Sequence, residues 1–451
     1  MPPDLRDWVP EDHMVHFVMD AVKLLNLDKA RINERGTGDA QYPPSMMMGL
    51  LIYCYAAGTF SSRKIERLTY DSVAVRYLCA DTHPDHDSIC KFRRENKDLL
   101  ESGFHQVLEC AARAKILKVG DITLADDGTK ILANASKHSA VSYGHAVEQM
   151  KLLEDEVAQL LAKAEDADST PLQDGLSVPA EVKRRTERIA KIKEAITVIE
   201  ERAKERHRQE QAEYERKLKA RADKEKATGK KSGGKTPQAP TEGPQDKDQY
   251  NFTDPESRIM KAGSGGHFEQ SYNAQAAVEI DSRLIVAQLV SDAPNDKEQL
   301  VPTLQTLSPV VESVAAVLVD SGFYSEEAVK KIESGKAQPA LQGTIVYAAT
   351  GRQRHGRSVT DLEQRDDPPP PPEGAPVSDI MAHRLQTKAG KILYAQRKQT
   401  IEPVFGIIKE AMGFRRFLLR GLEKVQLEWT LVTTSYNLKR LFHMGAKLQA
   451  A

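Results

Sequence analysis

The chain has 451 residues, enough for two or three domains, and its formal net charge is −1. The hydrophobic share of 40% indicates polar segments outside the cores. The charge balance excludes the large overall basic excess that is typical of many nucleic-acid-binding proteins. A local bias remains, because residues 381–440 contain 12 Lys or Arg against 4 Asp or Glu.

No targeting or membrane segment is evident. The apolar run Met46–Ala57 is shorter than the about 20 residues that a membrane helix needs, and no signal peptide is visible. All cysteines lie in the first quarter of the chain and none forms a CxxC pair, so we expect reduced thiols and a cytoplasmic location. They are Cys54, Cys79, Cys90 and Cys110.

Residues 1–116 are predicted to be helical. Met14–Leu25 is a plausible helix, and Met46–Ala57 is apolar almost all round, which indicates burial. Gly58 breaks the second helix, and Ser61 or Ser62 can cap a third. This is the outline of a helix-turn-helix, so DNA-groove reading and a packing or dimerisation role both stay open.

The segment His83–Cys90 contains potential metal ligands, but their spacing matches no zinc pattern. We prefer a structural interpretation in which Pro84 ends one segment and Asp87 or Ser88 caps the next helix.

The first strand of an α/β domain is expected at Ile122–Asp127. Asp126 and Asp127 close this run, and successive side chains of a strand point to opposite faces. Only one of the two carboxylates can therefore face a site. We favour Asp127, because the small residues Ala125 and Gly128 beside it leave room for a metal and a phosphate.

A predicted antiparallel coiled-coil hairpin then interrupts this domain. Apolar residues recur at steps of three and four from Ala146 to Ala164 and from Ile189 to Ala203. Both helices are expected to be short and to depend on their pairing. Residues 226–249 are mostly polar, Gly and Pro, and we expect disorder there.

Strands and helices alternate after Asn251, which favours an α/β core. The expected strands are Phe268–Ile280, Leu284–Ser291, Val314–Asp320 and Thr344–Ala349, and the expected helices are Asp296–Leu307 and Ser325–Ser334. Asp320 ends a buried strand, and residues 351–380 are expected to form a loop.

A late basic helix carries a third acid, Glu402. Its apolar face is predicted from helical spacing and consists of Ile401, Phe405, Ile408 and Met412. Pro403 follows the acid directly, so we expect Glu402 at a kink or a fresh helix start. The alternative is a basic amphipathic helix whose one acid is a solvated charge.

Two acids at strand ends and one on a basic helix suit a two-metal phosphoryl-transfer site. Several segments in this order resemble the bacterial insertion-sequence transposases of the DDE type, over about residues 8–442. These segments are Asp127–Lys130, Asn251–Met260, Tyr272–Gln275, Asn295–Lys297, Asp320–Tyr324 and Tyr394–Lys409. The resemblance implies an RNase-H-like mixed-sheet catalytic core.

The resemblance also implies the chemistry. Asp127, Asp320 and Glu402 would be the catalytic and metal-binding carboxylates, with Mg²⁺ as the cofactor and Mn²⁺ as a substitute. The implied partners are double-stranded DNA, as terminal repeats and target, and further copies of the chain. The implied location is the bacterial cytoplasm, at the nucleoid when the protein is bound to DNA.

In this family a Tyr-Arg-Glu-Lys pattern surrounds the third acid, which assigns DNA contacts to Tyr394, Arg397 and Lys409. Tyr394 and Arg397 lie one residue further from Glu402 than the family pattern has them. Lys398 occupies the position expected for the arginine, and a lysine cannot grip phosphate with two parallel hydrogen bonds.

The predicted organisation has five segments. They are a helical N-terminal domain (1–116), the first part of the core (117–145), the coiled-coil insertion and linker (146–249), the rest of the core (250–428) and a C-terminal helix (429–451). Two alternative functions remain: an RNase-H-like nuclease without strand transfer, and a non-catalytic, transposase-derived DNA-binding protein.

Overall fold

The computed structural model describes residues 4–31, 41–167, 178–228, 236–262, 267–349 and 366–448. The chain divides into two compact units. The larger unit combines Met1–Asn134 with Glu256–Ala451, and the smaller unit, Ala135–Pro255, is inserted between them.

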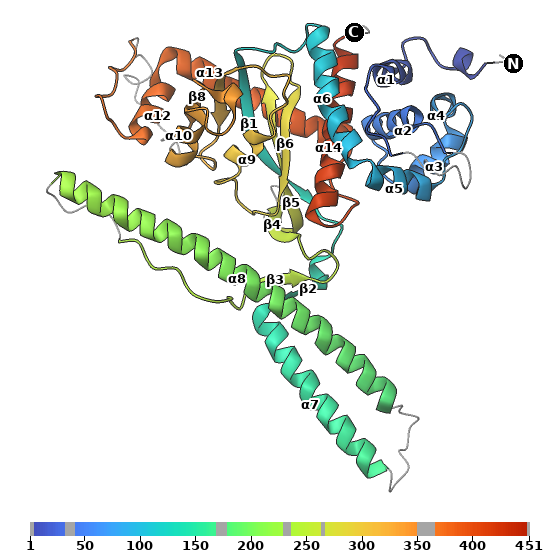
Figure 1. Cartoon of the computed structure of the whole chain (residues 1–451), viewed down its shortest axis with the longest axis vertical. Coiled ribbons are helices and arrows are strands. Elements are labelled where there is room, and N and C mark those ends of the chain that lie inside the picture. The colour runs from blue at the N-terminus through green and yellow to red at the C-terminus, as the bar shows by residue number, and fades with distance from the viewer. Residues whose placement is uncertain are drawn as a thin grey trace. The chain divides into compact units, whose positions relative to one another are not determined.

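The larger unit is built on a six-stranded mixed sheet (Figure 1). Its strands are β1 (Ile122–Leu132), β4 (Arg258–Ala262), β5 (His267–Glu279), β6 (Ile285–Ser291), β7 (Val314–Val319) and β8 (Ile345–Ala348). The order is β4-β5-β1-β7-β8, and β6 also pairs with β5. β5 runs antiparallel to β1, whereas β7 runs parallel to β1 and to β8. This confirms the predicted α/β class with a mixed sheet.

β1 is longer than the sequence predicts. The expected strand ends at Asp127, but β1 continues to Leu132 because it stays paired with β5 as far as Leu132↔Ser271. Its parallel pairing with β7 stops earlier, at Ala125↔Leu318. Asp127 therefore lies inside β1, two residues beyond Ala125, which is the last β1 residue that pairs with β7.

The helices after β6 differ in how well the sequence predicts them. α10 (Glu326–Glu333) follows Ser325 as expected. α9 (Leu300–Gln305) is only six residues long, so the predicted helix from Asp296 to Leu307 is wrong at both ends. The Asp296 carboxylate instead accepts hydrogen bonds from Asn273 of β5, which holds this residue against the sheet.

The helical prediction for the N-terminal region is confirmed. The helices are α1 (Met14–Lys23), α2 (Pro44–Ala56), α3 (Ser62–Asp71), α4 (Val73–Leu78), α5 (His86–Glu95) and α6 (Lys97–Arg113). α5 is capped by Asp85, not by Asp87 or Ser88, since the Asp85 Oδ1 accepts the Ser88 N–H at 2.6 Å. His86 hydrogen-bonds Glu66 at 2.8 Å, in keeping with the structural interpretation of this segment.

These helices pack onto the unit's last helix, α14 (Leu422–His443), with which α2 and α6 are in contact. Figure 1 shows α6 and α14 side by side. α14 begins before residue 429, where the sequence places the C-terminal helix.

α12 (Val377–Gln386) and α13 (Lys388–Gly406) precede α14. α12 begins within the predicted loop 351–380, of which residues 351–365 lie outside the described residues. α13 continues past Pro403 to Gly406, and a π-helical turn, Ile407–Ala411, follows. Glu402 therefore does not begin a helix. The predicted apolar face is confirmed, since Ile401 and Ile408 are fully buried.

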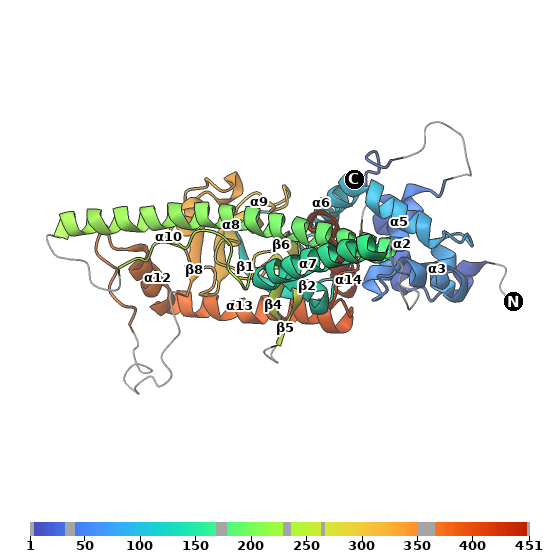
Figure 2. The same ribbon diagram turned by 90° about the horizontal axis from the view of Figure 1, so that it is seen from below.

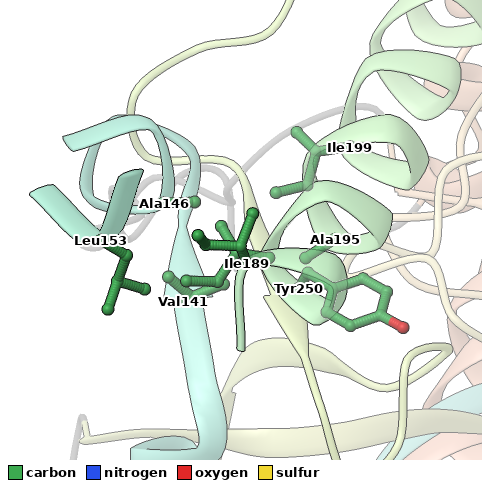
Figure 3. Packing of buried hydrophobic residues seen from close by; sticks show 8 residues of the cluster. Val141, Ala146, Leu153, Ile189, Ala195, Ile199 and Tyr250 are labelled. Atoms are coloured by element: carbon green, nitrogen blue, oxygen red, sulfur yellow. The ribbon is translucent and has the colours of Figure 1, made fainter. Parts of the chain in front are cut away.

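The smaller unit is a helical hairpin, seen from below in Figure 2, on a two-stranded ribbon that Figure 1 labels β2 and β3. The helices are α7 (Tyr143–Ala167) and α8 (Val178–Thr228), and the strands are β2 (Ala140–Ser142) and β3 (Gln249–Asn251). Heptad residues from both helices pack with ribbon residues into one core, as Figure 3 shows for Leu153, Ile189 and Tyr250. The predicted coiled-coil pairing is thus confirmed.

Two details of the hairpin prediction are wrong. α8 has 51 residues rather than being short, and ion pairs one turn apart, such as Glu213–Lys217, lie where its apolar residues thin out. Residues 226–228 are helical, and Arg206 binds Asp248 at 2.9 Å, so the predicted disorder does not extend over the whole of 226–249. Residues 229–235 lie outside the described residues.

Candidate active site

The sheet register brings Asp127 and Asp320 together. Ala125 of β1 pairs in parallel with Leu318 of β7, and two residues further along each chain stand Asp127 and Asp320. Paired residues of neighbouring strands share a face of the sheet, and so do alternate residues of one strand. Both carboxylates therefore leave the sheet on the same side. Burial raises the pKa of Asp127 to about 6, Arg397 opposes this shift, and Asp320 adds to it.

A glycine amide holds each of these carboxylates. The Gly128 N–H donates to the Asp127 Oδ1 at 2.8 Å, and the Gly322 N–H donates to the Asp320 Oδ1 at 2.6 Å. A Cβ at position 322 would lie 2.9 Å from the same Asp320 oxygen, so a side chain there would disturb the acid. Both acids are thus oriented by the backbone that follows them.

The three residues assigned to DNA contact all bind the sheet near these acids. The Arg397 Nη1 lies 3.1 Å from the Asp127 Oδ2, and only 9% of the arginine side chain is exposed. The Tyr394 hydroxyl donates to the Val319 carbonyl at 3.0 Å, and the Lys409 Nζ donates to the Lys130 carbonyl at 3.1 Å. α13 therefore presents Tyr394 and Arg397, and the π-helical turn after it presents Lys409, to β1 and β7.

Glu402 lies on the side of α13 opposite to its buried face. The buried face of α13 is formed by residues such as Arg397 and Ile401, and each residue turns the helix by about 100°. Glu402, one step beyond Ile401, is consequently exposed. The described residues contain no group of three His, Cys, Asp or Glu side chains that could hold a metal ion.

Two family models match the chain. The Transposase DDE domain matches residues 235–438, and the Transposase domain (DUF772) matches residues 3–95. These two matches indicate an insertion-sequence transposase of the DDE type. Comparison with curated proteins and with solved structures finds no match.

The match to the Transposase DDE domain describes the transposase in general terms. Its DDE domain implies an RNase-H-like core, a DNA substrate and, in general, the use of divalent metals. The matched segment contains Asp320 and Glu402, whereas Asp127 lies outside both matched segments. No helix in the described part of the transposase is long and apolar enough to cross a membrane.

The Asp127 and Asp320 pair fits a divalent cation. Such ions take carboxylate oxygens as ligands. The raised pKa of Asp127 has burial as its main cause and Asp320 as a further one. A cation held by these carboxylates would offset both effects, because it favours their charged forms.

The neighbouring acid of the transposase, Asp126, lies on the opposite face. Its side chain is fully buried, and neither carboxylate oxygen has a hydrogen-bond partner among the described residues. Burial, and then Asp127 and Asp296, raise its pKa well above the usual value. Asp126 therefore shares the face of Gly128 and not that of Asp320.

No role for Asp296 or Lys130 follows from the sequence alone. The Asp296 Oδ1 accepts hydrogen bonds from Asn273, Gln275 and Lys130 on the face of the sheet that carries Asp126. One sequence signal was available. Asn273 and Gln275 alternate within an otherwise apolar strand, which predicts that they share a face and need a polar partner there.

Proposed function

We propose that this transposase cleaves DNA at the ends of its insertion sequence and joins the released 3′ ends to target DNA. Asp127, Asp320 and Glu402 are proposed as its catalytic carboxylates. The observation that carries the proposal is the placement of Asp127 and Asp320 on one face, each oriented by a glycine amide. The match of the Transposase DDE domain around Asp320 and Glu402 supports it.

The proposal requires no protein nucleophile. Mg²⁺ or Mn²⁺ ions held by the carboxylates would activate water or a 3′-hydroxyl and stabilise the leaving oxygen. Asp127 and Asp320 supply the negative charge on the sheet. Glu402 supplies the third carboxylate from the exposed side of α13, which leaves it accessible to DNA-bound ions.

Tyr394, Arg397 and Lys409 are proposed to contact DNA phosphates. Arg397 binds the Asp127 carboxylate in the DNA-free chain, so it also orients this acid. Lys409 also has a partner in the DNA-free chain, since its ammonium group donates a hydrogen bond to the Lys130 carbonyl. A phosphate would give each cation a charged acceptor. Terminal repeats, target DNA and further copies of the chain are the proposed partners.

The test is a reaction of the whole chain with DNA that carries the element's ends, with Mg²⁺ or with Mn²⁺. Sequencing of the products should show cleaved ends and joined strands, and Asp320→Asn should abolish both while DNA binding persists. Cleaved ends without joined strands would favour the nuclease alternative. DNA binding without any metal-dependent cleavage by the unaltered chain would favour the non-catalytic alternative.

A further inference from the structure

A polar network lies under β1 on the face opposite to Asp127. The Asp296 Oδ1 accepts from the Asn273 Nδ2 at 2.6 Å, the Gln275 Nε2 at 2.9 Å and the Lys130 Nζ at 3.2 Å. Asn273 and Gln275 are fully buried, and 26% of the Asp296 side chain is exposed. One carboxylate oxygen thus gathers three donors from two neighbouring strands.

This network is packed against the backbone of Gly128. Gly128 pairs with Gln275 in the β1–β5 register, and Lys130 pairs with Asn273. A Cβ at position 128 would lie 2.6 Å from the Asp296 Oδ1 and 2.8 Å from the Asn273 Oδ1. Side chains do not approach one another so closely, so the network fills the space that any other residue at position 128 would need.

Gly128 is also the residue whose N–H holds the Asp127 Oδ1, at 2.8 Å. The peptide group between the two residues is planar, so the position of the Gly128 backbone determines where this N–H points. Asp127 is therefore held by Gly128 at one oxygen and by Arg397 at the other. The network packs on the opposite face of β1 and supports the contact between the Gly128 N–H and Asp127.

Asp296 also sets the orientation of the two amides. An ionised carboxylate only accepts hydrogen bonds, so Asn273 and Gln275 must both turn their NH₂ groups toward it. Their carbonyl oxygens are left buried and without partners among the described residues. Without the Asp296 carboxylate the Gln275 NH₂ group would lose its acceptor, whereas the Asn273 Nδ2 would keep the Ala293 carbonyl at 3.2 Å. The Gln275 amide would then be free to turn, and the packing against Gly128 would change.

We infer that Asp296 is a positioning residue that holds the Asp127 carboxylate in its metal-binding orientation through the Gly128 amide. The inference rests on the proposed function of Asp127 as a metal ligand. It assigns Asp296 no contact with DNA or metal. Partners that orient metal ligands from behind typically change metal affinity or activity by about 10–100-fold when they are removed.

The test compares Asp296→Ala with Asp296→Asn in the whole chain. Asp296→Ala removes the acceptor and should weaken Mn²⁺ binding, followed by electron paramagnetic resonance, by about 10–100-fold. The cleavage rate should fall by a similar factor at fixed Mn²⁺, and DNA affinity should stay unchanged. Asp296→Asn keeps an acceptor oxygen for the two amides and should restore most of the Mn²⁺ affinity.

Asp127→Asn separates this inference from the proposed function. If Asp127→Asn binds Mn²⁺ as tightly as the unaltered chain, the proposed metal site itself is wrong. If Asp127→Asn loses Mn²⁺ and Asp296→Ala does not, only the positioning role is overturned.

A second variant covers the case in which thermal unfolding shows that Asp296→Ala does not fold. Gly128→Ala pushes a methyl group into the intact network and should weaken Mn²⁺ binding in the same way. Mn²⁺ affinity equal to that of the unaltered chain in a folded Gly128→Ala variant would overturn the inference. Where both single variants fold, the double variant should lose less affinity than the two separate losses combined, because both act through one contact.

Discussion

At the scale of single residues, two adjacent carboxylates of β1 occupy different environments. Asp127 keeps 23% of its side chain exposed and is bound by Gly128 and Arg397. Asp126 is fully buried, and its oxygens have no partners among the described residues. The strand pleat alone separates them, because neighbouring side chains point to opposite faces.

Asp127→Asn should eliminate metal-dependent cleavage, because it removes a metal-binding charge and little volume. The matched control is Asp126→Asn, which alters the opposite face and should retain most of the cleavage rate. Cleavage of end-labelled DNA measures both. If Asp127→Asn cleaved DNA at the unaltered rate and Asp126→Asn did not cleave it, Asp126 would be the first metal ligand instead.

Asp126 should also make stability depend on pH. Burial is the main cause that raises its pKa in the folded chain above the usual 3.8. The folded state then binds a proton that the unfolded chain has released, so stability is lost as the pH rises from 3.8 through the folded pKa. The loss approaches about 1.4 kcal/mol for each unit by which the two pKa values differ.

Asp126→Asn stays neutral at every pH and tests this dependence. Its stability relative to the unaltered chain should increase from about pH 4 to about pH 8 in urea unfolding, since only the carboxyl releases a proton over this range. A stability difference that is the same at both pH values would show that folding does not raise the pKa of Asp126.

At the scale of elements, α13 and the π-helical turn that follows it carry three predicted DNA contacts to the sheet. Lys409→Ala should weaken DNA binding at low salt and reduce the slope of log affinity against log salt by about one, as expected for one lost phosphate contact. Lys409→Arg keeps the charge and serves as the matched control. An unchanged slope for Lys409→Ala would place this lysine away from the DNA.

α14 stabilises the segment that follows the π-helical turn. Glu428 is fully buried, and its Oε2 accepts the N–H groups of Leu418 and Leu419 at 2.9 and 3.0 Å. Burial raises the pKa of Glu428, and Arg93 of α5 opposes this shift. One side chain thus links α14 to the segment that follows the π-helical turn, and its charge interacts with that of Arg93 in the N-terminal helices.

Glu428→Ala should lower the free energy of unfolding by about 1–3 kcal/mol, because both backbone donors lose their acceptor. Glu428→Gln keeps an oxygen at this place and should lose less. Urea unfolding of the two variants measures the difference. Equal losses would show that the charge of Glu428, and not its role as an acceptor, stabilises this segment.

At the scale of the whole molecule, the insertion is a unit with its own core. Trypsin should cut first within Lys226–Lys235, a basic run with few apolar residues to bury. The fragments that brief digestion produces should be identified by mass spectrometry. Rapid cutting within residues 314–348 would contradict the proposed core.

Arg206→Ala provides the matched variant for this digestion. It removes the ion pair with Asp248 and the hydrogen bond to the Gly243 carbonyl, which together hold the returning segment. Trypsin should then also cut at Lys247. Protection of Lys247 in this variant would show that other contacts hold the segment.

Sequence periodicity predicted the elements whose partners lie close along the chain. The apolar face of α13 and the heptads of α7 and α8 are examples, because a helix forms from contacts three or four residues apart. It predicted the end of β1 wrongly, since β5 pairing extends that strand to Leu132. It also missed the Asp296 network, in which Lys130 lies 166 residues away along the chain.

The sequence by itself determined the α/β class, the helical insertion, the order of the three acids and the resemblance to DDE-type transposases. Only the tertiary structure decided that Asp127 rather than Asp126 faces Asp320, that Arg397 binds Asp127, and that Glu402 lies on the exposed side of α13. The physical reason is that residue order and spacing follow from the chain alone. Strand register and helix rotation are set by long-range packing, which a local pattern does not contain.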